Sequence, residues 1–270
     1  MKLRSGHAVV TGAASGLGLA IARRLRDAGW TLALVDLPAA DWSAHRHDEA
    51  TVVVPFDVRD AAAWRDLHAR LRREWPRLDL VVNAAGVGAS GEVGTLPEEQ
   101  WRRVIDTNLV GTALGCETFL PWLREQPAGA HLVNVASISG LVPFPTVAAY
   151  AASKAGIVAL SESIAAECPR RRPGVTVVCP GFFRSGLLGS WHFESAVESR
   201  EAERRMAGSW WTAERVAGRV LAAVRWNRRY VVVGVKARWL WRCKRLAPVA
   251  VTALVRGLYT RLHRGVGRRR

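Results

Sequence analysis

A tyrosine and a lysine four residues apart, Tyr150 and Lys154, are the residues of this chain best suited to proton-transfer chemistry. On a helix, positions four apart lie one above the other on the same face, so both side chains would enter the same space. A phenol titrates near ~10 in water, which is too high for efficient proton exchange at neutral pH. An adjacent ammonium favours the phenolate and lowers that pKa. The pair is therefore a candidate general acid/base, although the same spacing also describes a core aromatic beside a solvated lysine.

Two further polar residues could belong with this pair. Ser137 follows the apolar run 131–136, and it precedes Tyr150 by thirteen residues. Asn108 falls near the middle of a long helix predicted over 97–119, either continuous or interrupted, where an asparagine is unfavourable unless its amide is used. A functional role and a buried amide bonded to the backbone are both open interpretations of Asn108.

A glycine-rich turn, TGAASGLG at 11–18, lies between a predicted strand and a predicted helix. Glycines allow the backbone to approach a pyrophosphate, whose negative charge lies at the helix N-terminus. The next strand, 31–35, ends at Asp36, a carboxylate that can accept hydrogen bonds from ribose hydroxyls and repels a 2′-phosphate. No Lys or Arg in the turn or directly after Asp36 offsets that repulsion. A lone turn could be only a tight turn, but the whole pattern predicts nucleotide binding, with NAD favoured over NADP.

Strands and helices alternate along most of the chain. The predicted strands are 7–10, 31–35, 51–56, 79–83, 132–136, 175–179 and 230–233, and the other predicted helices are 19–28, 61–74 and 147–167. This alternation predicts an α/β fold, a single Rossmann-type doubly wound parallel sheet with helices on both faces. We expect one catalytic domain over residues 1–235 and a basic amphipathic C-terminal extension over 236–270.

From about residue 5 to about residue 235 these motifs resemble the short-chain dehydrogenase/reductase family. The resemblance implies a catalytic tetrad of Asn108, Ser137, Tyr150 and Lys154. In such a tetrad Tyr150 exchanges a proton with the substrate oxygen, and Ser137 polarises that oxygen. Lys154 lowers the pKa of Tyr150 and holds the nicotinamide ribose, and Asn108 anchors a proton-relaying water. The family also implies an NAD-dependent oxidoreductase that is a homodimer or homotetramer.

The resemblance further implies which residues hold the NAD cofactor. They are Gly12, Ser15, Gly16, Leu17, Gly18, Asp36, Asp57, Val58, Asn83, Ala85, Tyr150, Lys154, Pro180, Gly181, Phe183 and Ser185. Ser185 stands where a threonine usually bonds the nicotinamide carboxamide. Ala84 replaces the second asparagine of the family's NNAG motif, which predicts the loss of a structural hydrogen bond, and Phe183 stands where Ile or Val is common.

The segment after Pro180 and Gly181 is predicted to fold over the substrate. Its large apolar side chains would form a lid made of Trp191, Phe193, Met206, Trp210 and Trp211. The alternative is that these side chains only close the core. A lid of this kind favours a bulky, apolar secondary alcohol or ketone over a sugar. His192 is expected at the rim.

The charge of the chain is concentrated at its C-terminal end. Residues 1–214 hold 23 Lys and Arg and 23 Asp and Glu, whereas residues 215–270 hold 16 Lys and Arg and no acidic residue. The tail carries Trp239, Leu240 and Trp241 and a predicted helix beginning near Pro248. We favour contact with an anionic membrane surface. A subunit interface, a solvated tail and nucleic-acid binding are the alternatives, and the last is not expected because no recognition module accompanies the charge.

Composition bears on the compartment and on metals. The four cysteines form no CxxC pair and no regular spacing, so we expect neither a disulfide framework nor a metal site. Residues 1–6 lead directly into the first predicted strand, so a signal peptide is not expected. No apolar run approaches the ~20 residues that a helix needs to span a bilayer. We therefore expect a cytoplasmic protein, peripheral at most. An enzyme is the leading hypothesis, and a nucleotide-binding scaffold with little turnover is the alternative.

Overall fold

The computed structural model describes residues 5–43, 45, 50–126, 129–169 and 172–264. Its centre is a parallel sheet of seven strands in the order β3-β2-β1-β4-β6-β7-β9. The strands are β1 His7–Thr11, β2 Thr31–Asp36, β3 Thr51–Pro55, β4 Leu80–Asn83, β6 His131–Val135, β7 Gly174–Pro180 and β9 Tyr230–Val233. The strand order reverses direction between β1 and β4, and ligands of such sheets bind at the carboxyl ends beside that point.

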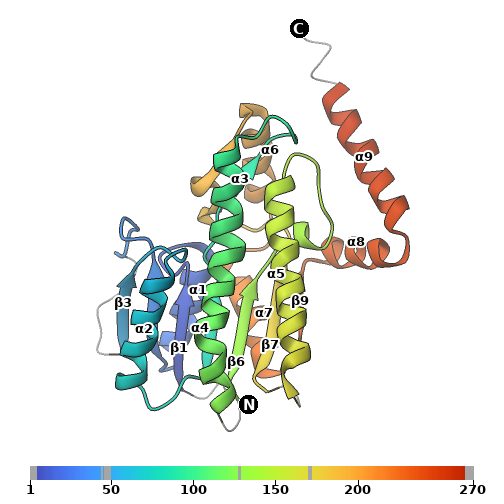
Figure 1. Ribbon diagram of the computed structural model, residues 1–270. Helices are drawn as coiled ribbons and strands as arrows, with labels where there is room; N and C mark the ends of the chain where they lie inside the picture. The colour runs from blue at the N-terminus through green and yellow to red at the C-terminus, as the bar shows by residue number, and fades with distance from the viewer. Residues whose placement is uncertain (1–4, 44, 46–49, 127–128, 170–171, 265–270) are drawn as a thin grey trace.

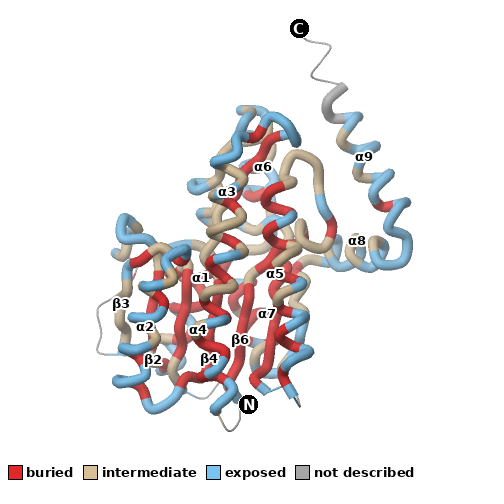
Figure 2. Tube along the Cα trace, viewed as in Figure 1, coloured by how far each residue is buried: buried red, intermediate tan, exposed pale blue. Residues whose placement is uncertain are grey.

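Helices cover both faces of the sheet (Figure 1). One face is packed by α1 Gly16–Asp27 and α7 Ala213–Arg225, and the other by α2 Ala61–Glu74, α4 Gly111–Glu125 and α5 Ala148–Glu167. Side chains alternate along each strand, so that on β1 Val9 belongs to one apolar layer while Ala8 and Val10 belong to the other. Figure 2 shows the resulting continuous buried zone through the strands and the facing sides of the helices. The predicted doubly wound fold is confirmed.

The long helix predicted over 97–119 is interrupted. It consists of α3 Glu98–Ile105, one π-helical turn over Asp106–Val110, and α4. The wide turn holds Asn108, the residue that the sequence marked as unfavourable in a regular helix. Such π-bulges are frequent at functional sites.

A second sheet was not predicted. Its two strands, β5 Gly88–Ser90 and β8 Trp191–Phe193, pair in parallel across about a hundred residues of sequence. Three residues are too few for a period-two pattern to be recognised. Together with α6 Ala196–Ala207, this sheet stands over the carboxyl ends of the central strands.

Two helices end the described chain. α9 Pro248–Arg264 begins at the predicted proline, whereas α8 Val235–Leu246 was not predicted. The inner face of α8 packs on β9 and on the segment after β6, and the rings of Trp241 and Tyr230 lie 5.3 Å apart. Among the described residues no helix combines the length and the apolarity needed to cross a membrane.

Candidate functional site

A cleft of about 1080 Å³ opens at the carboxyl ends of the strands. It is lined by the turn after β1, the ends of β2, β3, β4, β6 and β7, the first half of α5 and the segment 180–206. All predicted site residues line it except Asn83 and Asn108. Residues that are up to about 170 positions apart in sequence are therefore brought to one side of the sheet.

Three of the four tetrad residues meet on one wall of this cleft. Tyr150 and Lys154 are buried on α5, with Lys154 Nζ 5.7 Å from the centre of the Tyr150 ring. Lys154 Nζ donates to the backbone oxygen of Val135 at 2.9 Å. Ser137 caps the short 3₁₀ turn Ile138–Gly140 by accepting from the Ser139 N–H at 3.1 Å, and it hydrogen-bonds Tyr150. The three polar groups thus face the same space.

A glycine fixes the distance between Ser137 and α5. A Cβ on Gly140 would lie only 2.5 Å from the carbonyl carbon of Lys154, so a larger residue would push the 3₁₀ turn off the helix. The close backbone contact holds Ser137 beside Tyr150.

Burial dominates the protonation of the tyrosine and the lysine. It raises the pKa of Tyr150 to about 12, against which the hydrogen bond with Ser137 acts, and it lowers the pKa of Lys154 to about 8. In this structure the loss of hydration outweighs the hydrogen bond with Ser137, so the pKa of Tyr150 lies above its ordinary value and not below it as the sequence predicts. At neutral pH the phenol keeps its proton and Lys154 remains an ammonium. This combination can donate a proton to a bound oxygen.

Asn108 lies behind the cleft wall and is fully buried. Its Nδ2 donates to the Val87 oxygen and to Ser153 Oγ, both at 3.0 Å, and its Oδ1 accepts from the Val87 N–H at 2.8 Å. A Cβ on Gly86 would lie 3.1 Å from Asn108 Oδ1 and 3.4 Å from Lys154 Nζ, so the two groups approach the same backbone position. Of the two open interpretations, the amide bonded to the backbone is the one observed. Its role in a water relay stays a prediction.

The glycine-rich turn has the backbone that a close ligand requires. Gly12 and Gly16 have φ values of 64° and 54°, the left-handed region that favours glycine. A Cβ on Gly18 would lie 2.1 Å from the Gly12 oxygen, so the first turn of α1 reaches the loop only because Gly18 has no side chain. Thr11 Oγ1 accepts from the N–H groups of Ala84 and Ala85 at 3.0 and 3.1 Å, which ties the ends of β1 and β4 together.

Asn83 lies below the cleft and not in it. Its Nδ2 donates to Asn134 Oδ1 at 2.9 Å within the buried sheet, which gives the side chain a structural role, and its part as a cofactor contact stays a prediction. The backbone at Ala84, where a side-chain hydrogen bond was expected to be lost, is held by Thr11 instead.

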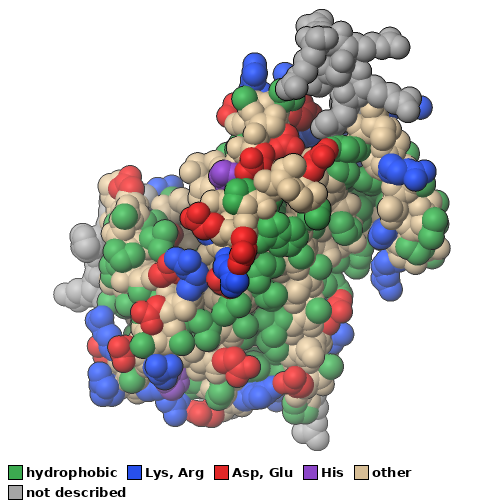
Figure 3. Space-filling view, turned by 45° about the horizontal axis from the view of Figure 1, so that its top comes forward, with side chains coloured by type: hydrophobic (Ala, Val, Ile, Leu, Met, Phe, Trp, Pro, Cys, Tyr) green, Lys and Arg blue, Asp and Glu red, His purple; other side chains and the backbone are tan. Residues whose placement is uncertain are grey.

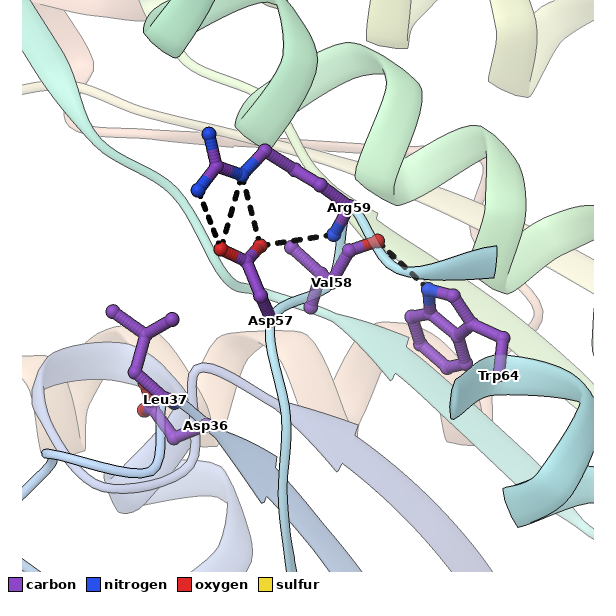
Figure 4. A network of polar contacts seen from close by, with 6 residues as sticks. All are labelled: Asp36, Leu37, Asp57, Val58, Arg59 and Trp64. Carbon is purple, nitrogen blue, oxygen red and sulfur yellow. Dashed lines mark hydrogen bonds and ion pairs between the residues drawn. The ribbon is translucent and has the colours of Figure 1, made fainter. Parts of the chain in front are cut away.

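Two aspartates mark the far end of the cleft (Figure 4). Asp36 accepts from the N–H groups of Ala14 and Leu37, both at 2.9 Å. Asp57 binds Arg59 through both carboxylate oxygens, with a shortest distance of 2.6 Å, and this pairing lowers the pKa of Asp57. Arg59, which the sequence analysis missed, thus turns its guanidinium to Asp57 and away from Asp36.

The cleft fits a dinucleotide at three separate places. The turn at Gly12 and Gly16 lines the cleft with exposed backbone that could hold a pyrophosphate, and the Asp36 carboxylate lines it where a ribose could bind. Ser185 Oγ is buried on the cleft wall and has no hydrogen-bond partner among the described residues. A buried hydroxyl without a partner costs free energy unless a ligand satisfies it, as a carboxamide would.

The predicted apolar lid is right for three side chains and wrong for two. Trp191, Phe193 and Met206 line the cleft, and the Trp191 ring centre lies 4.8 Å from that of Tyr150. Trp210 is 74% exposed and lies over the Arg215 guanidinium at 3.9 Å. Trp211 packs in the core layer of α1 and α7. Trp210 and Trp211 lie where the chain leaves the cleft and approaches α7. Their apolar character alone does not reveal this position.

Two groups hold Trp191 in place. Its Nε1 donates to Ser90 Oγ at 2.8 Å, and its ring covers Gly88, where a Cβ would lie 2.1 Å from Trp191 Cε3. The neighbouring His192 bonds Glu194 at 2.7 Å and does not line the cleft, as expected of a rim residue.

The C-terminal helix supplies cleft residues that the sequence analysis missed. Val255, Leu258 and Tyr259 of α9 line the cleft, and the Tyr259 hydroxyl donates to the carboxylate of Glu92. The signal available in the sequence was the spacing of Val251, Val255 and Tyr259 on one helical face. That spacing shows an inner face but not what the face covers.

Comparison with known proteins finds a matching family model and several related proteins. The family model for short chain dehydrogenases matches residues 6–194. "Probable oxidoreductase EphD" of Mycobacterium tuberculosis is 30% identical over 260 residues, which cover 92% of this chain and 44% of that protein. The 2-(R)-hydroxypropyl-CoM dehydrogenase of Xanthobacter autotrophicus is 35% identical over 196 residues, covering 69% of this chain and 78% of that one. The chain thus spans less than half the length of the first of these relatives.

A solved structure agrees with the fold. The short chain dehydrogenase/reductase of Burkholderia phymatum, crystallised in complex with NAD, superposes with a TM-score of 0.82. The two chains are 25% identical, and the match covers 91% of this chain and 94% of the other.

Proposed function

Since the chain belongs to the short-chain dehydrogenase/reductase family, we propose that it is an NAD(H)-dependent oxidoreductase that interconverts a bulky, apolar secondary alcohol and its ketone. The observation that carries this proposal is the meeting of Ser137, Tyr150 and Lys154 on one wall of a cleft that is also lined by the glycine-rich turn at 11–18. The apolar surface facing Tyr150 supports the substrate class. The NAD complex of the related structure supports the cofactor.

Each cofactor-facing group has a defined task. The backbone at Gly12 and Gly16 would bind the pyrophosphate. Asp36 would accept hydrogen bonds from the adenosine ribose, and Ser185 would hydrogen-bond the nicotinamide carboxamide. When bound, NAD(H) supplies or accepts the hydride. The Asp57 carboxylate stays paired with Arg59, which leaves Asp36 to act on the ribose.

The protein's own part of the reaction is proton transfer. The hydroxyl groups of Ser137 and Tyr150 donate hydrogen bonds to the substrate oxygen and stabilise negative charge that develops on it. In reduction, Tyr150 gives its proton to the oxygen that becomes the alcohol. In oxidation, the Tyr150 phenolate accepts the hydroxyl proton, and the nearby Lys154 ammonium stabilises that phenolate, more strongly than in water because both side chains are buried.

Apolar side chains in the cleft lining support the proposed substrate class. Trp191, Phe193 and Met206 come from the segment after β7, and Val255 and Leu258 come from α9. Burial of hydrocarbon against these side chains would be favourable by about 25 cal/mol per Å² of apolar surface removed from water. We also propose a homodimer or homotetramer through α4 and α5, which sedimentation velocity tests.

The first test is a paired titration with NADH and NADPH, which follows energy transfer from tryptophan to the reduced nicotinamide. We expect tight binding of NADH and much weaker binding of NADPH. This measurement does not depend on having chosen the right substrate. Binding of neither dinucleotide would overturn the oxidoreductase proposal.

A scaffold with the same fold is distinguished by Tyr150→Phe. An enzyme should keep NADH binding and lose turnover of a secondary alcohol or ketone by about 10²- to 10⁴-fold. Under the scaffold alternative the parent protein turns over none of a panel of apolar alcohols, and the substitution changes nothing.

A further inference from the structure

The outer face of α8 is apolar, and nothing in the described chain covers it. Val235, Trp239 and Leu246 are 61%, 61% and 88% exposed, and their spacing of four and seven residues places them on one side of the helix. Val249, at the start of α9, continues the exposed surface at 82%. The opposite side of α8 already packs on the body through Leu240 and Trp241. The outer stripe is therefore not needed for the fold.

Cations flank this stripe. Lys236, Arg238, Arg242 and Arg245 are exposed on α8, and none of the ion pairs among the described residues includes them. No acidic residue occurs in the sequence from 215 to 270. Figure 3 shows blue and green side chains on the projecting C-terminal segment at the right, whereas red side chains gather over the helices beside the cleft.

α8 is held rigidly enough to present this surface as a unit. The rings of Trp241 and Tyr230 lie in tilted contact at 5.3 Å, and Lys244 Nζ donates to Thr252 Oγ1 at 2.9 Å, which ties α8 to α9. α9 is anchored in turn by the buried side chain of Val251. The angle between the two helices is thus set by contacts on their inner faces.

We propose that the outer face of α8 and the start of α9, defined by Val235, Trp239, Leu246 and Val249, bind the surface of a bilayer that contains anionic phospholipids. Tryptophan and aliphatic side chains enter the headgroup region, and the flanking Lys and Arg pair with phosphates. Each cation near such a surface contributes to binding, and so does each apolar side chain removed from water.

The observations favour a bilayer over the two other candidate partners, a nucleic acid and a second copy of this chain. A nucleic acid would neutralise the cations but would leave the aliphatic stripe in water. A second copy meeting α8 across a two-fold axis would cover the stripe, but it would oppose the same unpaired cations on both sides. Only an anionic surface with an apolar interior satisfies both kinds of side chain.

The contact would also place the cleft next to the membrane. α9 leads from the proposed bilayer face directly to the cleft wall, where Val255 and Tyr259 lie. If the proposed function holds, an apolar substrate dissolved in the bilayer has a short path to Tyr150. This consequence rests on the proposed function, whereas the binding itself does not.

The test is flotation of the full chain with phosphatidylcholine vesicles and with vesicles of equal parts phosphatidylcholine and phosphatidylglycerol. We expect flotation with the anionic vesicles only, and weaker flotation at high salt because the ion pairs are screened. The double variant Trp239→Ser/Leu246→Ser should bind about tenfold less, and Arg238→Gln/Arg242→Gln/Arg245→Gln roughly a hundredfold less.

Two matched variants control for net charge and for an exposed tryptophan. Arg65→Gln/Arg70→Gln/Arg73→Gln on α2 lowers the net charge by the same amount as the α8 triple variant, and Trp226→Ser removes a tryptophan that is 63% exposed before β9. Both should float like the parent. Circular dichroism and thermal melting establish that each variant is folded, without reference to turnover.

Several outcomes would overturn the proposal. They are no flotation, equal flotation with both vesicle types, or the same loss in the α2 and α8 triple variants. Self-association abolished by Trp239→Ser/Leu246→Ser, without vesicle binding, would assign the face to a second copy. Binding of a DNA duplex that depends on the α8 cations but not on Trp239 or Leu246 would assign it to nucleic acid. Failure of the cofactor titration alone would leave the membrane proposal standing.

Discussion

Tyr150 and Lys154 illustrate how burial controls the chemistry of single residues. With the pKa of Tyr150 at about 12 and that of Lys154 at about 8, the neutral-pH site holds a protonated phenol beside an ammonium. This form donates protons. We therefore expect kcat/KM for ketone reduction to be level below pH 8 and to fall above it, as Lys154 loses its charge. Alcohol oxidation, which needs the phenolate beside the ammonium, should rise with pH up to about 8 and level off above it, because the gain in phenolate is then offset by the loss of the Lys154 charge. Initial rates in both directions measure this, and a reduction rate that rises above pH 8 would contradict it.

Lys154 should also destabilise the fold at neutral pH. Its pKa falls from 10.5 in the free side chain to about 8 when folded, so the unfolded chain binds the proton more tightly. The penalty, on the order of 3 kcal/mol, is fully present below pH 8 and disappears as the pH rises to the unfolded value. Lys154→Met should therefore raise the free energy of unfolding by about 2 kcal/mol at pH 7, after about 1 kcal/mol for the lost bond to Val135. Urea unfolding tests this, with the exposed Lys236→Met as control.

Asp36 is the residue on which cofactor choice should depend. Asp36→Asn removes the charge that repels a 2′-phosphate, and it keeps one oxygen for the N–H of Ala14 or Leu37. We expect NADPH to bind about tenfold or more tightly relative to NADH, since one unscreened charge contact is worth about 1–2 kcal/mol. Titrations of both dinucleotides measure the ratio. Asp41→Asn, in the loop that follows, is the control, and an unchanged ratio in Asp36→Asn would show that another residue selects the cofactor.

At the scale of elements, the sequence predicts what has a long period and misses what is short. The seven central strands and α5 were recognisable because their apolar runs and helical faces extend over enough residues. The pairing of β5 with β8 was not, because three residues carry no periodicity and their partners are a hundred residues apart. The helix α8 was missed because its apolar residues lie on two opposite faces, which hides the single stripe of an ordinary surface helix.

The small sheet β5–β8 should control the position of Trp191. Gly88→Ala would place a methyl group 2.1 Å from Trp191 Cε3, so the indole must leave its place beside Tyr150. We expect a loss of about 1–3 kcal/mol in the free energy of unfolding and a raised KM for apolar substrates. Gly257→Ala on α9 is the control, because a methyl group there meets no atom within 4 Å and Gly257 does not line the cleft. Equal effects of both substitutions would show that the close contact has no such role.

At the scale of the whole molecule, parallel strands explain why so much of the site was predictable. Their carboxyl ends share one edge, so residues that follow successive strands, such as Gly12, Asp36, Ser137 and Ser185, come together whatever their separation in sequence. The contribution of α9 follows no such rule. Its helical pattern predicts an inner face, but the fact that this face meets the cleft depends on the α8–α9 corner, which only the folded chain reveals.

The bond between Tyr259 and Glu92 joins the C-terminal helix to the loop after β5, across 167 positions of sequence. It raises the pKa of Tyr259 to about 12, so the hydroxyl remains a donor throughout the physiological range. Because the pair is largely open to solvent, the hydrogen bond should stabilise the docked position of α9 by about 1 kcal/mol or less. Tyr259→Phe should therefore raise KM for a bulky substrate about two- to fivefold with kcat unchanged, and it should speed amide hydrogen exchange in α9.

A double-mutant cycle tests whether this effect comes from the bond itself. If it does, Tyr259→Phe/Glu92→Gln will have the KM of either single variant, since the second change removes nothing further. Tyr230→Phe is the matched control, because Tyr230 donates to Glu162 in a similar pair outside the cleft. It should lower stability without changing KM. Additive effects of the two cleft substitutions would mean that each residue contacts the substrate separately, and that α9 is held over the cleft by its apolar face alone.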